Sequence, residues 1–216
     1  MKKQNVVIIS AICMVLVFVL GSYFYKHQRS KKLSFMAKEN ASIFVREHSL
    51  TYGSDDAKVY IVEFFDPACE TCRALYHPVK NLMAAYPGKM KHVMRYAPFH
   101  DGSDFVVKML EAARKQGKFK ETLEVMYKYQ PHWASHHNPQ PQLLWRVLPE
   151  AGVNIEQIRK DMNDPEIAKL IEQDLADAKT LNVRKTPEFF VNGKPLPSFG
   201  YTQLKELVET ELQANY

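Results

Sequence analysis

Two cysteines three positions apart are the residues of this sequence best placed to do chemistry. Cys69 and Cys72 enclose Glu70-Thr71, directly after an apolar segment and at the start of a predicted helix. At a helix N-terminus this spacing brings two thiols within bonding distance, and the free N–H groups and helix dipole stabilise a Cys69 thiolate. The pattern predicts thiol–disulfide exchange. Half of a zinc site is the alternative, but no second cysteine pair supplies the missing ligands.

Three histidines close together suggest a different chemistry. His132, His136 and His137 lie within six residues, and imidazole nitrogens bind zinc and copper. Together with Cys69 and Cys72 they would suit a protein that binds and delivers Cu(I), which is an alternative function from another class. A solvated, proline-rich loop is the simpler interpretation. We therefore expect neither a resident metal nor a cofactor.

The periodicity of the chain predicts an α/β fold around the cysteine pair. A buried strand is expected at 58–65, a helix at 69–85 with Pro78 inside it, and a second, parallel strand at 90–96. Helical spacing then dominates from 101 to 181. A strand at 188–191, a turn at Asn192-Gly193 and a helix at 202–213 complete the order β-α-β, helical block, β-β-α. The block is expected to hold helices at 105–115, 118–129, 142–148, 155–162 and 165–181, the first capped within 101–104.

The N-terminus is expected to be a retained membrane anchor. Residues 4–25 carry no formal charge, and about 20 apolar residues span a bilayer core. A cleaved signal peptide is the alternative, but the cleavage site would be poor, and aromatic residues at 23–25 are typical of a membrane interface. The four basic residues in 26–32 would, counted alone, keep the following domain in the cytoplasm.

Charge beyond the N-terminus excludes one class of partner. Six basic residues and no acidic residue lie in the first 32 positions, so the rest of the chain has a net charge of −1 out of the total +5. No basic surface for nucleic acid is expected. We expect an anchor at 1–25, a linker and lead-in helix at 26–52, with a helix at 33–48 and a turn at 52–56, and one domain at 53–216 with its helical insertion at about 101–181.

A Thr-Pro pair before the last strands adds specificity to the cysteine motif. Strand-CxxC-helix followed by Thr186-Pro187, a strand, Asn-Gly and a helix resembles the thioredoxin superfamily, and within it the DsbA-like thiol–disulfide oxidoreductases with a helical insertion. The resemblance covers roughly 53–213. It implies that Cys69 is the exposed attacking cysteine, Cys72 its buried partner and Glu63 the proton acceptor for Cys72.

The same resemblance implies a substrate groove beside the cysteines. Pro187 would be in the cis form and would expose the backbone of Thr186 for strand-like pairing with a substrate. Glu70 and Thr71 would also contact the substrate. The strongly oxidising members have Pro-His at these two positions, so an acidic neighbour predicts a less depressed Cys69 pKa and a weaker oxidant.

The implied function is disulfide exchange with cysteine-containing protein substrates in the periplasm, by an enzyme with a single span in the bacterial inner membrane. Its redox partner would lie in that membrane, either a quinone-linked oxidase or a thiol reductase. A periplasmic reductase or isomerase is the alternative within the class. Stable thiol oxidation is typical of compartments outside the reducing cytosol, and we weigh this above the local charge count.

Overall fold

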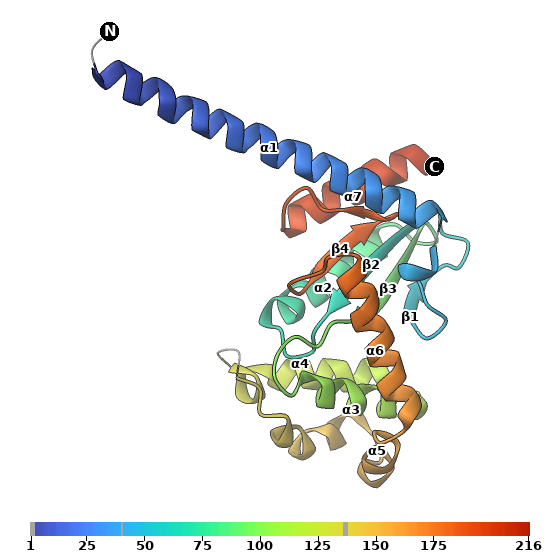
Figure 1. The fold of residues 1–216 in the computed structure, drawn as a ribbon. Coiled ribbons are helices and arrows are strands. Elements are labelled where there is room, and N and C mark those ends of the chain that lie inside the picture. Colours follow the sequence, from blue (N-terminus) through green and yellow to red (C-terminus); the bar gives the residue numbers. More distant parts are fainter. Residues whose placement is uncertain (1–2, 40, 136–137) are drawn as a thin grey trace.

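The computed structural model describes residues 3–39, 41–135 and 138–216, and a five-stranded sheet lies at its centre (Figure 1). The strand order is β1-β3-β2-β4-β5, and only β2 and β3 are parallel. The expected thioredoxin-like α/β fold is confirmed. The strands are β1 (Leu50–Gly53), β2 (Val59–Phe65), β3 (Met90–Tyr96), β4 (Glu188–Val191) and β5 (Lys194–Pro195).

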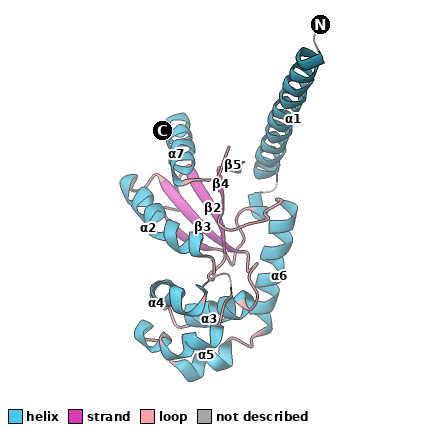
Figure 2. Cartoon of the chain, turned by 90° about the vertical axis from the view of Figure 1, so that its left-hand side faces the viewer, coloured by secondary structure: helices cyan, strands magenta, loops and turns pink. Residues whose placement is uncertain are grey.

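Strand β2 is central because its side chains are apolar on both faces. Val59 and Ile61 pack beneath α2 (Glu70–Ala85) and α7 (Tyr201–Asn215), whereas Val62 and Phe64 pack towards α6 (Pro165–Thr180). This alternation follows from the period of two in a strand. Helices therefore cover both faces of the sheet (Figure 2).

The helical insertion lies at one end of the sheet, beyond the start of α2 (Figures 1 and 2). It is built around a separate buried cluster that includes Leu110, Leu123 and Trp133 and also reaches both cysteines of the CxxC motif. The predicted insertion is confirmed. Its elements are α3 (Ser103–Lys115), α4 (Phe119–Trp133), η3 (Pro141–Arg146), η4 (Leu148–Ala151) and α5 (Ile155–Asp161), and α6 returns the chain to the sheet.

Several expected elements are wrong in detail. The helix expected at 142–148 is two 3₁₀ helices, because Pro149 cannot donate to the carbonyl four residues earlier. The turn expected at 52–56 begins with β1, an edge strand too exposed to show an apolar pattern. The α3 cap lies within the expected 101–104, at Gly102, which has a left-handed backbone and makes no side-chain capping bond.

The predicted anchor and the first part of the predicted lead-in helix form one continuous helix, α1 (Lys3–Glu39). No proline interrupts it, and η1 (Ala41–Ile43) follows it. Within α1, Val7–Arg29 is long and apolar enough to cross a membrane, and its most apolar window of 18 residues has a mean hydropathy of 2.6 and no buried residue. A signal sequence would pass the same test of length and composition.

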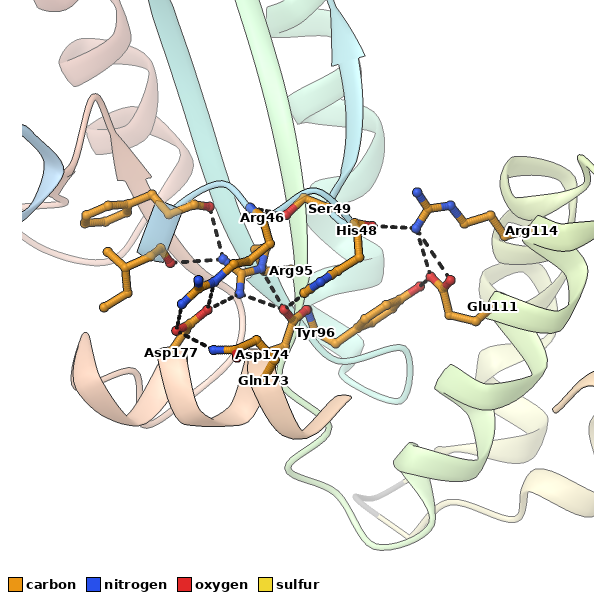
Figure 3. Close-up of polar contacts among 12 residues, drawn as sticks. Arg46, His48, Ser49, Arg95, Tyr96, Glu111, Arg114, Gln173, Asp174 and Asp177 are labelled. Atoms are coloured by element: carbon orange, nitrogen blue, oxygen red, sulfur yellow. Dashed lines mark hydrogen bonds and ion pairs between the residues drawn. The ribbon is translucent and has the colours of Figure 1, made fainter. Parts of the chain in front are cut away.

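A buried arginine joins three parts of the fold (Figure 3). Arg95 of β3 is fully buried; it donates to Asp174 at 2.8 Å and to Asp177 at 2.5 Å, both on α6. Its third nitrogen donates to the carbonyls of Ile43 and Phe44. The guanidinium thus has an acceptor in every direction that its donors point, which burial of a charge requires.

The segment before β1 completes this network. Arg46 donates to Asp177 at 2.7 and 2.8 Å, and this pair lowers the pKa of Asp177 although burial opposes the shift. His48 Nε2 lies 2.6 Å from Asp174, and Arg114 of α3 donates to the His48 carbonyl. The residues between α1 and β1 are therefore held by polar contacts with α6 and the insertion (Figure 3).

Replacing Arg95 should destabilise the whole body. In Arg95→Met the Asp174 and Asp177 carboxylates keep their burial and lose their main partner, and we expect a loss of about 3–5 kcal/mol in the free energy of unfolding. Denaturant unfolding of the detergent-solubilised chain measures this. Lys169→Gln, which removes the partner of Glu166 in an exposed ion pair, is the control and should change little. An equally small change in both variants would show that the Arg95 network does not stabilise the fold.

Candidate active site

The CxxC motif begins α2 at the carboxyl end of β2. Cys69 is the N-cap of the helix, with extended backbone, and its Sγ accepts a hydrogen bond from the Cys72 N–H at 3.4 Å. The Cys69 N–H in turn donates to the Asp66 carbonyl at 3.0 Å. Sulfur therefore occupies the capping position that a serine or aspartate oxygen usually takes, where the free N–H groups of the helix favour a negative charge.

The Thr186-Pro187 pair meets the cysteines although 114 residues separate it from Cys72 in the sequence. The peptide bond between Thr186 and Pro187 is cis, as the resemblance implied. The Cys69 thiol donates to the Thr186 carbonyl at 3.2 Å. Glu70 and Thr71 are exposed on the first turn of α2. Of the predicted substrate-contact residues, Thr186 thus lies against the Cys69 sulfur, and Glu70 and Thr71 follow Cys69 on the surface of α2.

The two thiols have opposite acidities. A hydrogen bond from the Cys72 thiol, with help from the N–H groups of Thr71 and Cys72, lowers the pKa of Cys69 to about 6 from an ordinary 9.0, although burial opposes the shift. Burial raises the pKa of Cys72 well above 9.0, and the hydrogen bond to Cys69 and the charge of Glu63 act in the same direction. At neutral pH one cysteine is a nucleophile and the other is a thiol.

Cys69 is less accessible than expected. Its residue surface is 6% exposed, against 1% for Cys72, so the expectation of an exposed attacking cysteine is wrong in degree. The cause is the fold around it, since the sulfur lies against the Thr186 carbonyl and belongs to the buried cluster of the insertion. A disulfide must therefore approach along a narrow direction to reach it.

Glu63 is a buried carboxylate on the face of β2 that α2 covers. It is 4% exposed, and its charge contributes to the raised pKa of Cys72. His92 of β3, which the sequence analysis missed, has its Nε2 atom 2.9 Å from a Glu63 oxygen, outside hydrogen-bond geometry. The structure thus places a buried acidic side chain whose charge acts on Cys72 on the sheet face beneath α2.

Asp66 holds the cysteine loop against the insertion, and the sequence analysis missed this too. The side chain is fully buried and accepts from the N–H groups of Ala68, Phe99 and His100 at 2.8–2.9 Å. It also accepts from His100 Nδ1 and the Ser103 hydroxyl. In the sequence Asp66-Pro67 only marks the end of a strand, and apart from Ala68 the partners of the Asp66 side chain lie 33 or more residues further along.

Gln130 provides a second link from the insertion to the cysteine loop. This buried residue of α4 donates from Nε2 to the carbonyls of Pro67 and Cys69, at 2.8 and 3.1 Å. Both sides of the loop, the Asp66 turn and the Cys69 carbonyl, are thus fixed by residues of the helical insertion. The insertion is therefore part of the active-site framework.

The histidine group receives no structural support as a metal site. His132 is exposed in the last turn of α4, which extends past the predicted end of that helix. His136 and His137 lie outside the described residues. Within 3–39, 41–135 and 138–216, no group of three or more histidine, cysteine or acidic side chains could hold a metal ion. The Cu(I) alternative stays an untested prediction.

Comparison with known protein families gives one match, which covers most of the chain. The family model described as thioredoxin matches residues 46–210, so the match includes the CxxC motif, the whole insertion and the Thr186-Pro187 pair. The matched region begins after the apolar part of α1.

Individual relatives are of two kinds. The probable disulfide bond formation protein D of Bacillus anthracis is 26% identical over 99% of this chain and 100% of its own. A Na⁺/H⁺ antiporter NhaA of Herminiimonas arsenicoxydans is 28% identical over 67% of this chain, which spans only 22% of that protein. Among solved structures, a thioredoxin-like oxidoreductase from Silicibacter pomeroyi is 30% identical, with a TM-score of 0.69 over 81% of this chain and 98% of its own.

The acidity of Cys69 predicts a pH profile for its alkylation. In a Cys13→Ser background the rate of Cys69 alkylation should be half-maximal near pH 6 and constant well above it, while Cys72 stays unmodified. The same lowered pKa affects folding: the Cys69 thiolate contributes its full stabilisation of the reduced protein above the ordinary pKa of 9.0, and this stabilisation is lost as the pH falls through about 6. Mass spectrometry after iodoacetamide treatment locates the label, with Cys69→Ser as the control. A midpoint near 9, or equal labelling of both cysteines, would contradict the assignment.

Proposed function

The chain belongs to the thioredoxin family, and we propose that it is a thiol–disulfide oxidoreductase that exchanges disulfides with protein substrates through Cys69 and Cys72. One observation carries the proposal: the Cys69 sulfur caps α2 while it touches the Thr186 carbonyl beside a cis proline. A nucleophilic sulfur and an open backbone edge for a substrate strand are thereby combined at one point.

Exchange proceeds through a mixed disulfide. The Cys69 thiolate attacks one sulfur of a substrate disulfide, a Cys69–substrate bond forms, and the other substrate sulfur leaves as a thiolate. Cys72 then loses its proton and attacks Cys69, which releases the second substrate thiolate and leaves a Cys69–Cys72 disulfide. The substrate gains two electrons and the enzyme loses two. The same steps in reverse oxidise a substrate dithiol.

Glu63 is proposed as the group that receives the Cys72 proton. Cys72 holds its proton at neutral pH, so the second step needs an acceptor in a place that bulk water does not reach. The negative charge of Glu63 helps to raise the pKa of Cys72, and His92 lies beside the Glu63 carboxylate. Proton transfer to Glu63 would couple deprotonation of Cys72 to its attack on Cys69.

Substrate recognition is assigned to the backbone of Thr186 and to the exposed pair Glu70-Thr71. An extended client segment that pairs with Thr186 would place its cysteine over Cys69, and such pairing reads backbone more than side chains. This arrangement suits varied protein clients. The similarity to a disulfide bond formation protein and to a thioredoxin-like oxidoreductase supports this assignment.

Location and redox partner complete the proposal. Helix α1 would anchor the chain in the bacterial inner membrane with the catalytic domain in the periplasm, where a Cys69–Cys72 disulfide can persist. A membrane-bound partner, either a quinone-linked oxidase or a thiol reductase, would restore the starting redox state. Which of the two acts decides whether clients gain or lose disulfides.

Removal of the resolving cysteine should trap clients. In cells that carry Cys72→Ser, mixed disulfides on Cys69 should accumulate, because no internal thiol remains to release them. Non-reducing electrophoresis after acid quenching detects these adducts, and reduction should remove them. The double variant Cys69→Ser/Cys72→Ser is the matched control. If the single variant forms no more adducts than the double one, exchange through Cys69 is not the activity.

The proposed topology predicts a pair of reporter signals. A C-terminal alkaline phosphatase fusion should be active, and a fluorescent-protein fusion that matures only in the cytoplasm should be dark. Deletion of residues 1–29 is the control and should reverse both signals. A bright fluorescent fusion of the full chain with no phosphatase activity would place the domain in the cytosol and indicate a cytosolic reductase.

A further inference from the structure

A hollow of about 660 Å³ lies where α1 passes the β4–β5 end of the sheet. Its α1 wall includes Tyr23, Lys26 and Arg29, and its body wall is formed by 185–199 together with Leu207. The N-terminal part of α1 projects away from the body, whereas its C-terminal part lies beside β5 (Figure 2). The hollow is thus at the point where the candidate membrane span leaves the folded body.

The lining of this hollow is strongly basic. The hollow is lined by one carboxylate, that of Glu188, and by the basic side chains of Lys26, Arg29, Lys185 and Lys194. Arg29 forms an ion pair with Glu188 at 3.5 Å, and Lys194 forms one with Glu211 at 2.6 Å. Among the described residues Lys26 and Lys185 enter no ion pair. Lys26 donates only to the Pro197 carbonyl at 3.5 Å, and Lys185 lies over the ring of Phe199.

Arg29 shows the same excess of donors. Its terminal nitrogen contacts the Leu181 and Asn182 carbonyls and Glu188, at 3.3–3.5 Å. Its Nε atom is buried and has no hydrogen-bond partner among the described residues. A buried N–H without an acceptor is costly, so the surroundings of Arg29 leave its donors incompletely satisfied.

The depth of the hollow along α1 indicates which anion. The residues from Val7 to Tyr25 rise about 28 Å, close to the thickness of a bilayer core. With the bilayer core placed over Val7 to Tyr25, the uncharged part of the candidate span, Lys26 would lie at the level of the lipid phosphates. On the opposite wall Leu196 and the 45% exposed Phe199 offer apolar contact beside the basic groups. An anionic headgroup above acyl chains has this same order of charge and apolar surface.

We propose that this hollow binds the headgroup of an anionic phospholipid, with Lys26 and Lys185 on the phosphate, Arg29 at its rim and Phe199 against the upper acyl chain. The inference rests on α1 being the membrane anchor of the proposed function. Bound lipid would join α1 to the loop after β5 that carries Leu196 and Phe199, and so fix the body against the membrane.

Native mass spectrometry of the full chain in detergent tests this proposal. Phosphatidylglycerol should form discrete adducts, and phosphatidylcholine with the same acyl chains should not. Lys26→Gln/Lys185→Gln should weaken phosphatidylglycerol binding about 30-fold, from the usual contribution of a basic side chain at an anionic surface. Lys31→Gln/Lys120→Gln removes the same charge at exposed sites outside the hollow and is the matched control.

Each remaining outcome has a defined meaning. Equal losses in the two double variants would show that general charge attracts the lipid and would overturn the site. Competition by millimolar inorganic phosphate would indicate a free-phosphate site and would overturn the lipid assignment. Reduction of insulin disulfides, measured on the same samples, reports disulfide exchange independently, and flotation with liposomes reports anchoring. Circular dichroism confirms that each variant is folded.

Discussion

The burial of one guanidinium constrains much of this architecture. Arg95 occupies the middle layer of the molecule, and the energetic cost of a charge there is offset only because α6 presents Asp174 and Asp177 and the segment before β1 presents two carbonyls. Three parts of the chain must therefore be in place together. The insertion begins after β3 and ends with α6, so the same contacts set its position relative to the sheet.

The cysteine chemistry depends on that position. The loop between β2 and α2 is bonded to the insertion at two points: Asp66 of the loop accepts from Ser103, and Gln130 of α4 donates to the Pro67 and Cys69 carbonyls. The loop in turn presents Cys69 as a cap and leaves Cys72 under the first turn of the helix. Two chemically identical side chains thus become an acid and a very weak acid by placement alone.

Elements that are determined by interactions between residues close in the sequence were predicted from local patterns. The apolar run of β2, the helical spacing of α2 and the turn at Asn192-Gly193 all formed as expected, and the helical block after β3 was recognisable from its periodicity. The pairing of Cys69 with Thr186 followed from family resemblance, since nothing in either segment alone specifies the other.

The missed features are long-range and polar. Asp66, Gln130 and Arg95 resemble ordinary turn, helix and strand residues, and their roles arise from long-range partners between 33 and 82 residues away. Strand β1 was missed because four largely exposed residues carry no apolar alternation. The continuity of α1 was missed because a charged, amphipathic stretch after an apolar one suggests two elements when only composition is considered.

That unbroken helix has a mechanical consequence. If α1 crosses a bilayer as proposed, its hydrogen bonds to the body through Lys26 and Arg29 would restrict how far the body can turn relative to the membrane. In an anchored molecule the Cys69 sulfur would therefore stay at a nearly constant distance from the lipid surface and in a nearly constant orientation relative to it. The enzyme would then encounter partners by lateral diffusion in the membrane. Proteins whose cysteines lie at the same distance from the bilayer as Cys69 would be encountered more often than proteins whose cysteines lie farther away.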